Sequence, residues 1–191
     1  MTHQTTAPIE HMSLQQTARS AESLIHMHNA GDLAWDPPHA PYQRGAVWTR
    51  DQQVQLIASG LAGIPIPAII INRRDWAKCG PDDPYYVVID GQQRLRTFAA
   101  WYAGELAVPA SWWQPDFVEG TRETDDGPYV TISDLTLVGR RYFGHRVILP
   151  VAEASVPTIQ EEAEIYLRVN GYGTVQSDDD LDNAARIAAG E

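Results

Sequence analysis

Lysine and cysteine are almost missing from this chain of 191 residues, which has one of each, Lys78 and Cys79. A P-loop of the form GxxxxGK[ST] needs a lysine after its glycines, so that type of nucleotide site is excluded, as is one built on a buried catalytic lysine. A single thiol forms neither an internal disulfide nor a cysteine-rich zinc site, and it fits a reducing cytosol. Any phosphate must therefore be held by arginine, backbone amides and a helix N-terminus.

Long apolar runs are missing as well. The longest, Ile64 to Ile71, is far shorter than the roughly 20 residues of a membrane helix. The N-terminus has no basic start followed by an apolar run, so no secretory signal is visible. We expect a cytoplasmic protein without membrane contact, with residues 1–12 as a disordered leader and residues 13–191 as one domain.

Positive charge is scarce: 14 Lys and Arg stand against 25 Asp and Glu, a net charge of −11. Residues 1–115 hold ten acids and eight bases, whereas residues 116–191 hold fifteen acids and six bases. This balance argues against broad attraction to nucleic acid, which needs a basic face. The candidates for a local DNA-binding patch lie in the first half: Arg44, Arg50, Arg73 and Arg74. The acidic second half equally suits a protein partner.

Hydrophobic spacing predicts short strands interspersed with helices, which indicates an α+β fold with a small mixed sheet surrounded by helices. Helices are predicted for residues 13–30, 49–62, 92–106 and 157–169, and from Ser177 onward. Strands are predicted for residues 64–72, 85–90, 129–132 and 146–154. Between Val108 and Gly144 the pattern is weak, and Trp112 and Trp113 are interpreted mainly as packing residues.

The segment YYVVIDGQQRLRTF carries the strongest chemical signal. A hydrophobic strand ends in Asp90 and Gly91 and a helix begins at once, so unpaired backbone N–H groups and the helix dipole favour an anion there. Gly91 permits a sharp turn, Gln92 and Gln93 offer amide donors, and Arg94 can bind a phosphate through two parallel hydrogen bonds. The alternative is an ordinary strand–turn–helix with a surface arginine.

Two further segments carry weaker signals. In PYQRGAVWT, Gln43 and Arg44 follow Tyr42 and precede a tryptophan, which suits contact with a phosphate or a base, or simply a packed loop. In YLRVNGYGTVQS, Arg168 and Asn170 stand where a predicted helix ends, before two glycines. This second arrangement suits a binding turn or an ordinary helix C-cap.

Taken together and in this order, the three segments resemble the N-terminal domain of the GmrSD-type modification-dependent restriction enzymes (domain of unknown function 262), in the ParB/sulfiredoxin-like superfamily. The resemblance runs from about Leu33 to Ala185. It implies a ParB/sulfiredoxin-like fold that binds a nucleoside triphosphate (ATP, GTP or CTP), usually with Mg²⁺. It also implies that nucleotide hydrolysis is coupled to the recognition of modified DNA.

The resemblance also implies roles for single residues. Asp90, Gly91, Gln92, Gln93 and Arg94 would form the triphosphate loop, with Asp90, Gln93 and Arg94 as the catalytic candidates. Arg94 would contact the phosphates, and Asp90 would either hold Mg²⁺ or orient the attacking group. The remaining nucleotide-binding residues would be Tyr42, Gln43 and Arg44 on the opposite wall, with Arg168 and Asn170.

No His-rich ββα-metal pattern occurs in the sequence, so we do not expect a nuclease that acts alone. The leading hypothesis is a nucleotide-binding protein, an NTPase, that works in DNA restriction, modification or phage–host conflict, with a separate nuclease or modification subunit as its partner. One alternative is a phosphotransferase that acts on a hydroxyl group of a small molecule or a modified base. The other is a non-catalytic module that binds DNA or a protein.

Overall fold

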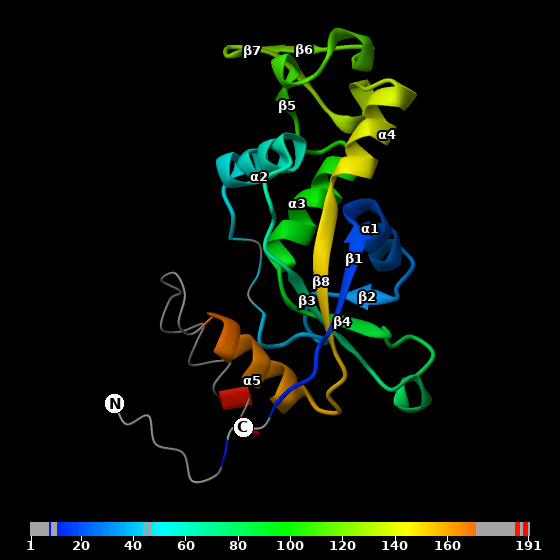
Figure 1. Ribbon diagram of the computed structural model, residues 1–191, viewed down its shortest axis with the longest axis vertical. Coiled ribbons are helices and arrows are strands. Elements are labelled where there is room, and N and C mark those ends of the chain that lie inside the picture. The colour runs from blue at the N-terminus through cyan, green and yellow to red at the C-terminus, as the bar shows by residue number, and fades with distance from the viewer. Residues whose placement is uncertain are drawn as a thin grey trace, which may run out of the picture.

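The computed structural model describes Pro8, residues 11–43, Gly45, residues 47–170, and Arg186, Ile187, Ala189 and Gly190. The strands in this part of the chain are β1 (Gln15–Ser20), β2 (Leu33–Ala34), β3 (Ile69–Arg73), β4 (Tyr86–Asp90), β5 (Val108–Pro109), β6 (Arg122–Thr124), β7 (Gly127–Val130) and β8 (Ile148–Ala154). The α-helices are α1 (Ala21–Asn29), α2 (Arg50–Ala62), α3 (Gln92–Tyr102), α4 (Leu137–Arg146) and α5 (Ile159–Asn170), and the short 3₁₀ helices are η1 (Trp76–Lys78), η2 (Ala110–Trp112), η3 (Pro115–Phe117) and η4 (Ile132–Asp134). Figure 1 shows their arrangement, which confirms the predicted α+β class. Among the described residues, no helix is long and apolar enough to cross a bilayer.

The larger sheet is mixed and has the strand order β1-β8-β3-β4-β2. β3 lies at its centre, parallel to β8 and antiparallel to β4. The register between β3 and β4 shifts next to Ile70, which lies opposite Asp90, the last residue of β4. The polar end of β4 therefore lies beside the central strand of the sheet.

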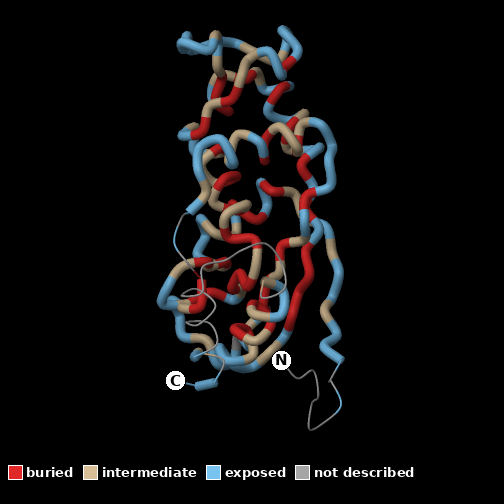
Figure 2. Tube along the Cα trace, turned by 90° about the vertical axis from the view of Figure 1, so that its left-hand side faces the viewer, coloured by how far each residue is buried: buried red, intermediate tan, exposed pale blue. Residues whose placement is uncertain are grey.

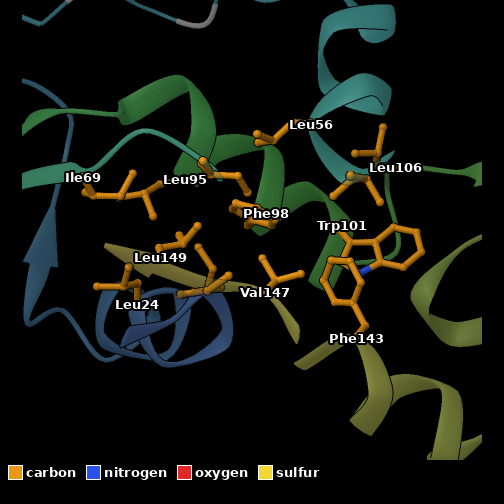
Figure 3. Close-up of a cluster of buried hydrophobic side chains, with 14 of the residues drawn as sticks. Leu24, Leu56, Ile69, Leu95, Phe98, Trp101, Leu106, Phe143, Val147 and Leu149 are labelled. Carbon is orange, nitrogen blue, oxygen red and sulfur yellow. The ribbon is translucent and has the colours of Figure 1, made fainter. Parts of the chain in front are cut away.

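The side chains of β4 alternate between the two faces of the sheet, and both faces are covered, so the strand is hydrophobic along most of its length. On one face, Val88 belongs to a large core that includes residues of α1 and α3. On the other face, Val87 and Ile89 belong to a smaller core with residues of α5. Figure 2 shows the buried positions in the interior of the molecule, and Figure 3 shows Leu24 and Phe98 in the large core.

The second sheet, with the order β5-β7-β6, lies with α4 at one end of the molecule (Figure 1). Aromatic rings connect this end to the main core, since Trp101 of α3 stacks on Trp113 at 5.9 Å and packs against Phe143 of α4 at 5.4 Å. Trp113 is buried, so its interpretation as a packing residue is confirmed, whereas Trp112 is 37% exposed and does not fit this interpretation. The sequence pattern did not reveal α4. This helix contains two glycines, and only two of its residues, Gly139 and Phe143, are buried.

The helix predicted for residues 13–30 is wrong in its first part. Residues 15–20 form β1, which pairs antiparallel with β8, and only the second part is the helix α1. Ser20 begins this helix, because its side chain accepts a hydrogen bond from the Ser23 amide. Pairing with a sheet edge far along the chain outweighs the local helical spacing, a tertiary effect that sequence periodicity does not contain.

The other predicted elements of the main sheet and its helices are confirmed. Thr49 begins α2 with a capping box that includes Gln52, and Gly63 ends it in the left-handed conformation. The strand predicted for residues 64–72 begins only at Ile69, after its two prolines, which cannot donate to a ladder. The helix predicted from Ser177 lies outside the described residues except at Arg186 and Ile187, and most of the predicted leader lies outside them too.

Candidate functional site

The junction of β4 and α3 depends on a glycine. Gly91 has φ 98°, in the left-handed region, and a Cβ atom at this position would lie 2.5 Å from Cδ1 of Ile69. Any other residue would therefore be strained in its backbone and would collide with the central strand. Gly91 is also the N-cap of α3, and no side chain caps the helix there. The first backbone N–H groups of α3 are thus left without a side-chain acceptor.

Asp90 and Arg94 form an ion pair across this junction. The Arg94 Nη2 atom lies 2.6 Å from Oδ2 of Asp90. The side chains are 11% exposed for Arg94 and 23% exposed for Asp90, so the pair is partly buried and differs from an ordinary surface ion pair. The guanidinium also folds back over Gly91, within 3.1 Å of the point where a Cβ atom would stand. Acid, glycine and arginine thus form one compact charged group at the start of α3.

The end of α5 reaches the same group. The side-chain amide of Asn170 lies 3.5 Å from Oδ1 of Asp90 and donates to the Tyr166 carbonyl at 3.0 Å. Arg168, two residues earlier, lies on the other side of the helix, where it is 56% exposed and pairs with Glu164 at 2.5 Å. Of the two residues predicted at this helix end, the structure brings Asn170 to the junction and leaves Arg168 on the surface.

Gln43 holds the second predicted segment against β4. Its side-chain Nε2 atom donates to the Val88 carbonyl at 3.0 Å and to the Ile89 carbonyl at 2.5 Å. The side chain is buried, so these bonds form away from water. Gln43 therefore acts in this structure as an anchor that places its loop beside the carboxyl end of β4.

Gln93 fixes the continuation of the same loop. Its Nε2 atom donates to the Gly45 carbonyl at 2.8 Å, and its Oε1 atom accepts from the Val47 amide at 3.1 Å. Arg44 lies outside the described residues, but both of its neighbours in the chain are thus held to α3 or β4. The loop carrying Gln43 and the helix carrying Gln93 are joined directly.

Gln92 makes a third connection of this kind. Its buried side chain donates to the Trp35 carbonyl at 2.6 Å and lies 3.5 Å from Oδ1 of Asp36. The amide groups of Gln92 and Gln93 therefore bind protein groups in this structure. Their predicted donation to a phosphate stays a prediction.

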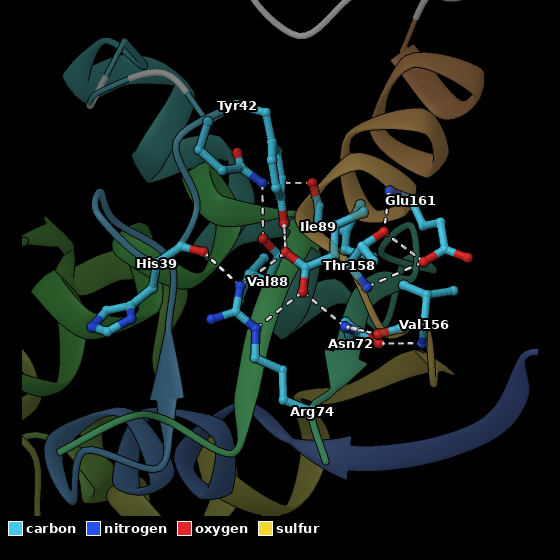
Figure 4. Close-up of polar contacts among 11 residues, drawn as sticks. His39, Tyr42, Asn72, Arg74, Val88, Ile89, Val156, Thr158 and Glu161 are labelled. Atoms are coloured by element: carbon cyan, nitrogen blue, oxygen red, sulfur yellow. Dashed lines mark hydrogen bonds and ion pairs between the residues drawn. The ribbon is translucent and has the colours of Figure 1, made fainter. Parts of the chain in front are cut away.

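Tyr42 belongs to a buried polar network centred on Glu162 of α5, which is 1% exposed (Figure 4). The Tyr42 hydroxyl donates to Glu162 Oε2 at 3.0 Å, and Asn72 donates to Oε1 at 2.7 Å. Arg74 makes two bonds to the same carboxylate, at 3.1 and 3.0 Å. Burial, and then the negative charge of Glu162, raise the pKa of the Tyr42 hydroxyl, so it remains a neutral donor.

This network joins three elements that surround the junction. Glu162 lies on α5, Asn72 lies on β3 and Tyr42 lies in the loop before α2. A buried carboxylate without its partners is strongly unfavourable, so the network holds the three elements in one arrangement. Because Asn170 stands at the other end of α5, the same contacts determine where it meets Asp90.

Sequence reasoning missed Glu162 and Asn72, although both leave a signal. Glu162 precedes Ala163 in the apolar stripe of α5, and Asn72 follows three isoleucines of a buried strand. A polar residue at a buried position needs hydrogen-bond partners, and two such residues can satisfy each other.

The DNA-binding patch predicted in the first half of the chain stays a prediction, and the contacts of its arginines differ from one another. Arg74 is bound to Glu162, and Arg73 lies 3.6 Å from the carboxylate of Glu153. Arg50 donates to a backbone carbonyl, that of Glu105, at 2.7 Å. Neighbouring carboxylates neutralise Arg73 and Arg74, so these arginines do not form a free basic face.

Asp90 is the metal-ligand candidate at the junction of β4 and α3. The described residues include no group of three or more His, Cys, Asp or Glu side chains that could hold a metal ion. Asp90 offers one partly exposed carboxylate, with the amide of Asn170 beside it. This donor set fits Mg²⁺, which is commonly bound by one or two carboxylates together with phosphate oxygens and water. Among the described residues, this donor set is too small to hold a metal ion through protein ligands alone.

The fold and the site define a class: an α+β domain in which side chains from three distant segments meet at the carboxyl end of a central strand and the uncapped start of a helix. A family profile described as the N-terminal domain of the GmrSD restriction endonuclease matches residues 37–171, and the chain belongs to this family. The matched range contains the whole site, which confirms the family predicted from its three segments. Comparisons with curated proteins and with solved structures found no match.

Proposed function

We propose that this chain is the nucleotide-binding domain of a DNA restriction system, and that it binds and hydrolyses a nucleoside triphosphate with Mg²⁺ at the junction of β4 and α3. One observation carries the proposal: the Asp90–Arg94 pair lies over the uncapped start of α3. Membership of a restriction endonuclease family supports the biological setting.

The charges of the site suit a magnesium–triphosphate complex better than a simple anion. An anion alone would take Arg94 and leave Asp90 as a repelling, partly buried carboxylate. A complex that contains both phosphate and Mg²⁺ gives each member of the pair a new partner of opposite charge. Arg94 binds phosphate oxygens, Asp90 binds the metal, and neither charge is left unpaired.

The neighbouring residues then have distinct roles. Arg94 and the first amides of α3 stabilise negative charge that develops on the transferred phosphoryl group. Asn170 orients the Asp90 carboxylate, and the hydrogen bonds of Gln43 and Gln93 keep Gln43 and Gly45 beside the phosphates. No lysine is needed, which agrees with the single lysine in the sequence lying elsewhere, at Lys78 in η1.

Thermal denaturation of the full chain with ATP, GTP or CTP, each with and without Mg²⁺, tests the binding step. A nucleotide at 100 times its dissociation constant adds about 2.7 kcal/mol to the free energy of unfolding. We expect stabilisation that requires Mg²⁺ and is lost in Arg94→Ala. Arg122→Ala serves as a matched control, because Arg122 also pairs with an aspartate but lies on β6. No stabilisation by any of the three nucleotides would reject the proposal.

The chemical step is tested with γ-labelled nucleotide. Hydrolysis releases the label as free phosphate in the presence of wild-type protein and Mg²⁺, and Arg94→Ala slows this release roughly 10²–10³-fold. Label that appears on an added hydroxyl acceptor instead would identify a phosphotransferase and contradict the hydrolysis step, while the binding step would stand.

A further inference from the structure

The arginines of the described residues fall into two groups, those that form an ion pair with Asp or Glu and those that do not. Seven of the arginines among the described residues form ion pairs with Asp or Glu: Arg19, Arg73, Arg74, Arg94, Arg96, Arg122 and Arg168. In the same part of the chain, those without an ion pair are Arg50, Arg140, Arg141, Arg146 and Arg186. Three of these five lie on one helix, α4. Among the described residues of this acidic chain, α4 thus carries more arginines without an ion pair than any other element.

After its first turn, which exposes Leu137 and Val138, the surface that α4 turns to solvent is basic. Arg140, Arg141, His145 and Arg146 are all exposed, whereas Gly139 and Phe143 are buried on the other side. The helix contains no Asp or Glu. This surface therefore presents three permanent positive charges. An acid from another element lies close to the helix, since the carboxylate of Glu22 in α1 is 3.2 Å from the point where a Cβ atom of Gly144 would stand.

Two of these guanidinium groups are held in place by neutral partners. Arg140 donates through Nε and Nη2 to the carbonyls of Leu135 and Ser133, at 2.9 and 3.1 Å. Arg146 lies over the ring of Tyr142, 4.4 Å from its centroid. Such contacts order the side chains and leave their charge intact, so less entropy is lost when an anion binds.

We propose that α4 binds the phosphate backbone of duplex DNA. From Arg140 to Arg146 the helix rises about 9 Å, at about 1.5 Å per residue. Each strand of a duplex carries one negative charge per about 3.4 Å of the axis, so about three phosphates of one strand lie along this stretch. Planar guanidinium groups bind phosphates through paired hydrogen bonds. The choice of DNA over an acidic protein rests on the proposed function in a restriction system, and on this match in charge density.

Binding of a short fluorescein-labelled duplex to the full chain, followed by anisotropy between about 50 and 200 mM salt, tests the proposal. Arg141→Gln with Arg146→Gln removes two phosphate contacts, so the slope of log K against log salt becomes shallower by about 2. Arg73→Gln with Arg122→Gln is the matched control. It changes the net charge equally at two exposed arginines that are already ion-paired.

We expect the control to keep the wild-type slope. Equal loss of slope in both double variants would show that only net charge matters and would overturn the proposal. Failure of the wild-type chain to bind the duplex at the lowest salt would also overturn it, and would point to an acidic protein as the partner of α4.

The measurement is independent of the nucleotide site. It is made without nucleotide, and Arg94→Ala is expected to keep the wild-type slope for DNA. The α4 double variant is in turn expected to keep its stabilisation by nucleotide and Mg²⁺. Failure of one proposal is therefore seen separately from failure of the other.

Discussion

The carboxylate of Asp90 and the guanidinium of Arg94 meet at 2.6 Å across the end of a strand and the first turn of a helix. The residue between them that makes the turn, Gly91, has a backbone conformation and a contact with Ile69 that only glycine permits. The local geometry thus brings one acid and one base together at the helix start, where backbone N–H groups also favour negative charge.

The first prediction concerns the two charges of this pair. If hydrolysis occurs at the junction, Arg94→Ala should lower its rate roughly 10²–10³-fold, because one group that stabilises the developing charge is lost. Asp90→Asn should raise the Mg²⁺ concentration needed for half-maximal rate, since a neutral amide is a weaker ligand for this ion. Steady-state rates measured against Mg²⁺ concentration check both. An unchanged magnesium dependence in Asp90→Asn would remove Asp90 from the metal site.

The second prediction separates the two residues at the end of α5. Asn170→Ala should weaken nucleotide stabilisation, because Asp90 loses a neighbour that orients it. Arg168→Ala should leave it unchanged and alter the free energy of unfolding by less than about 1 kcal/mol, as expected for an exposed ion pair. Nucleotide-dependent thermal shifts of the two variants are compared. The reverse ranking would mean that Arg168 turns into the site when ligand binds.

The third prediction concerns the glycine turn. Gly91→Ala should destabilise the fold by about 2–4 kcal/mol, the sum of a left-handed backbone and a collision with the Ile69 side chain. Gly63→Ala is the matched control, because it has a similar φ of 71° and no atom within 4 Å of its Cβ position, so about 1 kcal/mol is expected. Urea denaturation measures both.

A double variant separates the steric part of the Gly91→Ala destabilisation from the backbone part. Ile69→Val removes the Cδ1 atom that Gly91→Ala would strike. The combined destabilisation should be smaller than the sum of the two single effects, because the variants share this contact. Strict additivity would show that the backbone alone accounts for the need for glycine.

The fourth prediction tests the buried network. Glu162→Gln should destabilise the protein by about 3–5 kcal/mol, because it leaves the Arg74 guanidinium without a carboxylate in a largely buried position. Glu164→Gln, on the same helix but in an exposed pair, should have an effect below about 1 kcal/mol. Equal effects in urea denaturation would mean that the network does not hold α5 in place.

The fifth prediction concerns alkaline stability. Burial raises the pKa values of both Tyr42 and Tyr102 in the folded protein, with the charges of Glu162 and Glu22 as the next causes. The unfolded chain therefore releases these protons first, at a pKa of about 10. Stability is fully present below this pH and falls above it, by up to about 1.4 kcal/mol per pH unit for each tyrosine.

Two phenylalanine variants distinguish these tyrosines. Each variant should remove its share of the alkaline slope. At neutral pH Tyr42→Phe should destabilise by about 1–3 kcal/mol because Glu162 loses a hydrogen bond. Tyr102→Phe should be neutral or stabilising, since its buried hydroxyl has no hydrogen-bond partner among the described residues. Unfolding free energies of both variants, measured at pH 7 and above pH 10, test the predicted stabilities and the predicted alkaline slopes.

Most of the fold could be predicted because local pattern and tertiary context agree. The buried strand ending at Asp90, the glycine turn and the helix that follows are visible in the sequence and present in the structure. The exceptions show the limit: the pattern missed α4, and it predicted a helix at residues 15–20. These residues have helical spacing, yet they pair with β8, which lies more than a hundred residues away along the chain. Hydrogen bonds to a distant strand leave no trace in local periodicity.

The site was predictable in its location and less so in its details. Gln43, Gln92 and Gln93 have the chemistry of ligand donors, but their amides bind backbone carbonyls and loop amides of the protein itself. Arg168 and Asn170 are two residues apart, and helix geometry turns one away from the junction that the other reaches. Residue type alone does not show whether a side chain contacts a ligand or holds neighbouring segments of the protein in place.

By itself the sequence determined which chemistry is available. It has one lysine, few bases, a glycine at a strand-to-helix turn and three polar segments in the order of one family. Only the tertiary structure decided which charges are neutralised by a neighbouring charge of opposite sign. Seven of the arginines that the structure describes form ion pairs with Asp or Glu, whereas the three arginines of α4 do not. The reason is that electrostatic interaction depends on distance in space, and the chain brings together acids and bases that the sequence keeps far apart.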